Sequence, residues 1–179
     1  MAFNISDFRG QLVGGGARPN LFRVTLGAPA YAEFPAEKMA FMAKAAQLPE
    51  STIGSIEVPY FGRNIKIAGD RTFAEWTITV INDEDFLVRD ALERWMDGID
   101  THTRAGTKRG SATSNPGSYV ADGVVEQFSK EGDVIKTVTF VNLFPTNVAA
   151  IDLAWDSNDA IEEFTVTLQY DHYTSNTTT

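Results

Sequence analysis

The sequence predicts a mainly β protein in which two packed antiparallel sheets form a sandwich or half-barrel, with one flanking α-helix. Several segments alternate apolar and polar side chains with a period of two, and a single segment repeats apolar residues at helical spacing. The chain has 179 residues, of which 43% are hydrophobic, so it is long enough for one domain with its own core.

The N-terminal segment, residues 1–20, is expected to be a flexible arm, because it contains three consecutive glycines at positions 14–16. The remainder, 21–179, is predicted to be a single domain. The arm lacks the basic start and the apolar stretch of a signal peptide. The sequence has no run of ~18 apolar residues, so we expect no membrane insertion.

Three segments alternate cleanly and are predicted to be strands with one core-facing side: 21–26, 73–81 and 164–171. In the second of them, Trp76, Ile78 and Val80 alternate with threonines. Threonine, valine and aromatic residues also suit strands by propensity.

Two further strand regions are less regular. In 53–67 the alternation changes phase at Phe61-Gly62, which indicates a turn or bulge and hence a hairpin with an aromatic tip. In 134–148 apolar residues occupy both faces, as with Phe140 and Leu143. Such a strand is either central in a large protein or half of an interface, and in a chain of this size the second interpretation is favoured.

One helix is predicted after the acidic segment 82–85, which provides capping residues and first-turn acids. Within this helix, apolar residues recur at helical spacing and predict a core-facing stripe: Val88, Ala91, Leu92, Trp95, Met96 and Ile99. Gly98 is expected to stop the helix.

A long polar loop follows, residues 101–118. It carries Arg104, Lys108 and Arg109 without any acid. Its length predicts a functional or mobile segment. Pairing with the acidic body of another subunit and simple solvation both remain open.

Composition argues against an enzyme. The net charge of −9 disfavours an ordinary nucleic-acid binder, and the lack of cysteine excludes disulfides and thiolate zinc sites. His102 and His172 have no catalytic signature around them, and the sequence has no GxSxG motif. The segment 156–159 begins like a calcium loop, but it lacks the required glycine and glutamate, because Ile161 and Thr167 stand there. No catalytic, cofactor-binding or metal-binding residue is predicted.

Several motifs, in order along nearly the whole chain, resemble the tail tube protein family of contractile-tailed bacteriophages. They are Ala17-Arg18-Pro19-Asn20-Leu21-Phe22, Ala68-Gly69-Asp70-Arg71-Thr72-Phe73 leading into Trp76-Thr77-Ile78-Thr79-Val80-Ile81-Asn82-Asp83, Phe144-Pro145-Thr146-Asn147-Val148, and Leu153-Ala154-Trp155-Asp156-Ser157-Asn158.

The resemblance implies a structural subunit whose inner sheet closes into a large barrel within a hexameric ring. Stacked rings would form a hollow conduit that delivers DNA to the host without sequence-specific binding. The implied partners are the protein itself, the tail sheath, baseplate and terminator proteins, and a tape-measure protein in the lumen. The implied location is the virion, after assembly in the host cytoplasm.

Two alternatives stay open. The first is a tube subunit of a secretion system, such as type VI secretion, or of a phage-like injection particle. The second is a monomeric ligand-binding sandwich that stacks sugars on tryptophans, although the strand and helix phases predict that Trp76 and Trp95 are buried. Solution mass separates the second alternative from a tube.

The residues themselves nominate contact surfaces. Exposed aromatics at the predicted hairpin tip, Tyr60 and Phe61, with Arg63 beside them, are candidates for contacts between subunits or rings. Apolar residues of the arm are the other candidates: Phe3, Ile5 and Phe8. From net charge alone we also hypothesise an acidic channel wall that repels phosphate.

Overall fold

The structure, a computed structural model, describes residues 4–101 and 115–178. The strands are β1 Phe22–Leu26, β2 Ala43–Ala46, β3 Ser51–Tyr60, β4 Arg63–Phe73, β5 Trp76–Ile81, β6 Ala121–Phe128, β7 Val134–Val148, β8 Glu163–Gln169 and β9 His172–Ser175. The helices are α1 Ile5–Gln11, α2 Ala36–Met42 and α3 Leu87–Ile99, with short 3-10 turns η1 Val13–Gly15, η2 Ala30–Ala32 and η3 Pro116–Ser118. The predicted mainly β fold with a flanking helix is confirmed.

Two antiparallel sheets share the long strand β7. Its first half pairs with β6 and β9, and β6 pairs in turn with β1. Its second half pairs with β8, which continues the second sheet through β5 to β2. The strands β3 and β4 pair only with each other and form a separate hairpin.

The strand β7 changes sheets at Asn142, whose φ of 57° is positive. The backbone N–H of Asn142 donates to the Asp122 carboxylate at 3.3 Å, and its side-chain amide donates to Asp171 at 2.6 Å. The bend shifts the phase of the strand, so Phe140 and Leu143 both lie fully buried in the same core. The expectation that this strand forms half of an interface because it is apolar on both faces was therefore wrong for this pair.

The core lies between the two sheets and under α3. Trp76 from β5 stacks on Phe140 from β7, with ring centroids 4.0 Å apart and planes inclined by 19°. The indole N–H of Trp76 donates to the carbonyl of Gln47, and that of Trp95 donates to the carbonyl of Tyr119. Both indoles are therefore buried with their polar atoms satisfied, as buried tryptophans require.

The predicted start and stop of α3 need correction. The helix begins at Leu87, after Phe86 with φ 53°, and Asp85 accepts the Leu87 N–H at 3.2 Å. Asn82 does not cap the helix, since it is buried and pairs with Glu162 through both its backbone and its side chain. Gly98 lies inside the helix, which continues to Ile99.

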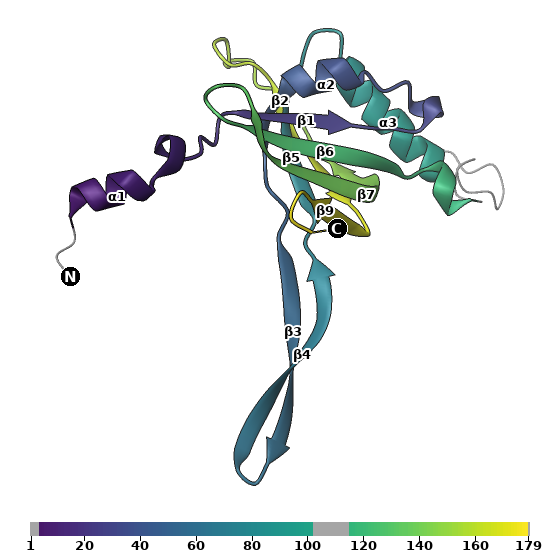
Figure 1. The fold of residues 1–179 in the computed structure, drawn as a ribbon. Helices are drawn as coiled ribbons and strands as arrows, with labels where there is room; N and C mark the ends of the chain where they lie inside the picture. The colour runs from purple at the N-terminus through teal and green to yellow at the C-terminus, as the bar shows by residue number, and fades with distance from the viewer. Residues whose placement is uncertain (1–3, 102–114, 179) are drawn as a thin grey trace.

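Two parts of the chain project from the body (Figure 1). The N-terminal arm extends to one side and contains α1, a helix that the sequence pattern does not predict. The β3–β4 hairpin projects from the end of the body opposite to α2 and α3. Among the described residues, no helix has both the length and the apolar character needed to cross a membrane.

Candidate inter-subunit surfaces

The β3–β4 hairpin carries apolar side chains that nothing in the single chain covers. The register pairs Val58 with Ile65 and Ile56 with Ile67, so all four side chains lie on one face of the hairpin. Their exposed fractions range from 41% to 56%. An isolated two-stranded hairpin is marginally stable in water, and this one exposes an aliphatic stripe as well.

The opposite face of the hairpin is polar. Lys66 and Glu57 face each other across the strands at 3.4 Å, and the side-chain amide of Asn64 donates to Glu57 at 3.2 Å. The two faces therefore differ sharply in character, as expected of a strand pair that lays one side on a partner and leaves the other in water.

The hairpin tip is a two-residue turn made by Phe61 and Gly62, with φ of 44° and 78°. Positive φ at both positions is the type I′ turn, which favours asparagine and glycine and strains a bulky residue. The Phe61 ring, 91% exposed, packs edge-on against Tyr60 at 4.6 Å. Strain of this kind is kept where the side chain is needed for contact.

Arg63 lies across the hairpin from Tyr60. Within the part of the chain that the structure describes, its guanidinium has neither a hydrogen bond nor an ion pair. Among the described residues, the tip thus combines two exposed rings with one unpaired cation, and its role as a contact surface stays a prediction.

The N-terminal arm exposes its apolar residues as well. Asn4 caps α1 by accepting the Ser6 N–H at 3.2 Å, yet the helix has no buried residue. Ile5 and Phe8 are both largely exposed. Phe3, the third predicted contact residue of the arm, lies outside the described residues. A short amphipathic helix with nothing against its apolar side is marginal on its own.

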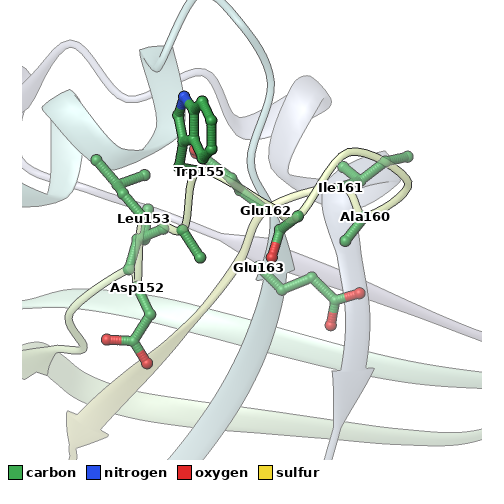
Figure 2. Close-up of a pocket in the computed structure, with 10 residues that line it drawn as sticks. Asp152, Leu153, Trp155, Ala160, Ile161, Glu162 and Glu163 are labelled. Atoms are coloured by element: carbon green, nitrogen blue, oxygen red, sulfur yellow. The ribbon is translucent and has the colours of Figure 1, made fainter.

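A third surface was missed by sequence reasoning. The loop 151–162 joins β7 to β8 and projects Leu153, Trp155 and Ile161, which are 82%, 100% and 74% exposed. Residues of this loop, Asp152 and Glu162 among them, line an open hollow of about 450 Å³ (Figure 2). The available signal was an isolated tryptophan and three large aliphatic residues within a segment otherwise rich in acids.

Charged side chains pair at the start of α3. Lys38 from α2 contacts the carboxylates of both Asp83 and Asp85. The hydrogen bond from Lys38 lowers the pKa of Asp85, and the two carboxylates raise the pKa of Lys38. These ion pairs hold α2 against the loop before α3, which is a structural role.

The described residues contain no cluster of three or more His, Asp or Glu side chains arranged to hold a metal ion. The segment 156–159 forms neither helix nor strand, and the Ser157 N–H donates to the Ala154 carbonyl at 3.2 Å. His172 is exposed in β9, whereas His102 and the bases of the predicted loop, Arg104, Lys108 and Arg109, lie outside the described residues.

Comparisons with known proteins agree on one family. A family model described as phage tail tube protein matches residues 17–176. Tail tube protein gp19 of Enterobacteria phage T4 is 35% identical over 173 residues, covering 96% of this chain and 94% of the relative. The tail tube protein of Serratia phage KSP90 is 29% identical over 170 residues, with 93% of each chain covered.

Solved structures share the fold at lower identity. A chain from the PVC extracellular contractile injection system, in its extended sheath-tube complex, superposes with a TM-score of 0.60 at 15% identity, covering 98% of this chain and 99% of that one. A chain from the anti-feeding prophage tube-terminating cap gives a TM-score of 0.64 at 18% identity, covering 90% and 91%.

Proposed function

Because this chain belongs to the phage tail tube protein family, we propose that six copies close into a ring and that rings stack into the hollow tube of a contractile tail. The observation that carries the proposal is the extent of the match, since the family model spans residues 17–176 and includes both sheets, the hairpin and α3. The family is structural, which agrees with the lack of a catalytic signature in the sequence.

Ring closure is supported by the open edges of the sheets. The first sheet ends at β1 and β9, and the second ends at β2 and the second half of β7. If each of six copies lends one four-stranded sheet, the ring has ~24 strands. At ~4.8 Å between strands and a tilt of ~40°, its diameter is ~48 Å between backbones, which leaves room for a DNA duplex. Closure would also remove edges that otherwise aggregate.

The lining of such a channel would be richer in hydroxyl groups than in acids. The outward side of β5 and β8 carries threonines at positions 77, 79, 165 and 167, with Glu163 as the single charged residue among the outward positions of these two strands. On the first sheet, Arg23 and Glu126 pair at 2.6 Å and offset each other. The hypothesis of an acidic wall, which rested on net charge alone, gains no support from these faces. A largely neutral polar wall serves the same end, because its cations Arg23 and Lys44 are already paired with Glu126 and Glu163 and attract phosphate less strongly.

We assign the aliphatic face and aromatic tip of the hairpin, with Tyr60, Phe61 and Arg63, to contacts between subunits or rings. The arm is assigned the same role through Ile5 and Phe8, and Phe3 belongs to the same proposal. Their exposure in the single chain supports this assignment, since apolar patches of this kind mark association surfaces. The division into an arm, 1–20, and one domain, 21–179, is part of the same proposal.

The tube would have further partners. A sheath protein, a baseplate and a terminator are proposed because the structurally similar chains come from complexes described as sheath-tube, baseplate and tube-terminating cap. A tape-measure protein in the lumen, DNA in transit, residence in the virion and assembly in the host cytoplasm follow from the family role. A phage-like injection particle remains the alternative, while the 35% identity to a phage protein favours the phage tail.

Electron microscopy of the purified full chain over a range of concentrations tests the proposal. We expect rings with sixfold averages and hollow stacks of them at the highest concentrations. Rings of another symmetry, or solid filaments, would contradict it. A chain that stays monomeric by mass throughout and binds a sugar would favour the ligand-binding sandwich, although Trp76 and Trp95 are buried and only Trp155 is exposed for stacking.

A further inference from the structure

We propose that the loop 151–162 is the acceptor for the hairpin tip of a copy in the adjacent ring, with Tyr60 and Phe61 packing against Trp155. The inference rests on the proposed stacking of rings and adds the identity of the two surfaces that meet. It commits to a second copy of this chain as the occupant of the hollow beside Trp155.

The two surfaces lie at opposite ends of the molecule. In Figure 1 the hairpin of β3 and β4 projects downward from the body, while the yellow-green loop between β7 and β8 projects at the top. They therefore cannot meet within one copy. A protrusion at one end and a hollow at the other make a head-to-tail contact, which repeats along an axis without closing and so generates a filament.

The apolar surfaces match in kind. The tip presents two rings, Tyr60 and Phe61, which are 63% and 91% exposed. The loop presents the fully exposed indole of Trp155, flanked by Leu153 and Ile161. Aromatic residues that lie uncovered in the monomer and pack in pairs at contacts supply most of the binding energy of typical interfaces.

The charges are complementary. The loop 151–162 contains four acids and no lysine or arginine. Asp152 lines the hollow beside Trp155. The tip offers the guanidinium of Arg63, which has no partner among the described residues. Opposite charges around an apolar centre fix the register of a contact and reject a like-charged surface.

Cross-linking tests the contact directly, because the chain has no cysteine of its own. The variant Phe61→Cys/Leu153→Cys, assembled and treated with a short bismaleimide, should give a ladder of covalent oligomers on a denaturing gel. A mixture of the two single variants should stop at dimers. The matched control, Phe61→Cys/Thr177→Cys, places its second cysteine on another exposed part of the body and should give no ladder.

Charge reversal is the second measurement and does not depend on the cysteine variants assembling. Arg63→Glu and Asp152→Lys should each shorten tubes, and the double variant should restore their length. An exposed ion pair changes an equilibrium about twofold, and six such contacts per ring multiply to roughly sixtyfold in ring–ring association. Circular dichroism checks that each variant folds.

The outcomes separate this inference from the tube itself. If the wild-type chain forms no rings or tubes, the proposed function fails. If tubes form but the cysteine pair gives no ladder, the acceptor site is wrong and the tube stands. If the cysteine pair does not assemble, the charge reversal decides, and additive losses in the double variant would overturn the proposal.

Discussion

The ring of Tyr31 lies so close to the backbone of Gly98 that a Cβ placed on this glycine would be 2.2 Å from the ring carbon Cε2. The Tyr31 hydroxyl donates to the carbonyl of Trp95 at 3.4 Å, one turn earlier in α3. Gly98 therefore allows the η2 segment to dock on the helix.

Replacing this glycine by alanine should destabilise the subunit. We expect Gly98→Ala to lower the free energy of unfolding by up to about 2 kcal/mol, since overpacking costs ~1–3 kcal/mol and the better helix propensity of alanine returns ~1 kcal/mol. In a Tyr31→Ala background the same substitution should instead stabilise the protein. Urea denaturation of the wild type, the two single variants and the double variant measures the change in the free energy of unfolding in each background. Equal changes in the two backgrounds would refute the steric explanation.

Tyr170 provides a second prediction. Its hydroxyl is buried without a hydrogen-bond partner among the described residues, while its ring packs on Phe140 at 4.9 Å. Tyr170→Phe removes the unsatisfied group and keeps the ring. We expect the free energy of unfolding at pH 7 to stay the same or rise by up to ~1 kcal/mol. A clear loss in urea denaturation would show that the hydroxyl has a partner.

The same tyrosine predicts a pH dependence. Burial, and then the neighbouring Tyr173, raise the pKa of Tyr170 above its ordinary value of 10.0. The folded state therefore resists ionisation of Tyr170. The contribution of this group to the free energy of unfolding is fully present below pH ~10 and is lost as the pH rises toward the pKa of the folded state. The wild type should lose stability above pH ~10 more steeply than Tyr170→Phe, and parallel curves would contradict the prediction.

Phe61 allows stability and assembly to be separated. Phe61→Asn places a residue that suits type I′ turns at the strained φ of 44°. The isolated subunit should unfold at an unchanged or slightly higher denaturant midpoint, whereas tubes should become short or absent. Phe61→Tyr, which keeps the ring, should assemble normally. Full-length tubes from Phe61→Asn would show that the aromatic tip is not a contact.

Much of the fold could be predicted because the alternation of apolar and polar residues indicates which side chains of a strand are buried. Trp76, Ile78 and Val80 alternate in the sequence and are buried as expected. The bend of β7 could not be predicted, because it depends on hydrogen bonds from Asn142 to Asp122 and Asp171, which are both far from Asn142 in the sequence. The prediction that Gly98 ends the helix is wrong for a similar reason. Its contact with Tyr31, which is far away in the sequence, cannot be deduced from the sequence of the helix alone.

The candidate surfaces were predictable to different degrees. The phase change at Phe61-Gly62 located the hairpin tip, because a turn interrupts alternation directly. The loop with Trp155 was found only in the structure, because a tryptophan in a sequence is usually read as core. Its complete exposure depends on tertiary placement.

The arm yields the last prediction. Deleting residues 1–16 should leave the free energy of unfolding nearly unchanged, because α1 buries nothing and the hydrogen bond from Lys130 to the Gly14 carbonyl at 2.9 Å, which the deletion removes, is exposed to solvent. Assembly should weaken, since Ile5 and Phe8 would gain burial only on a neighbour. The full-length variant Ile5→Ser/Phe8→Ser should reproduce the defect and so separate side-chain contact from arm length. Electron microscopy measures tube length, and tubes of normal length from the truncated chain would show that the arm does not dock.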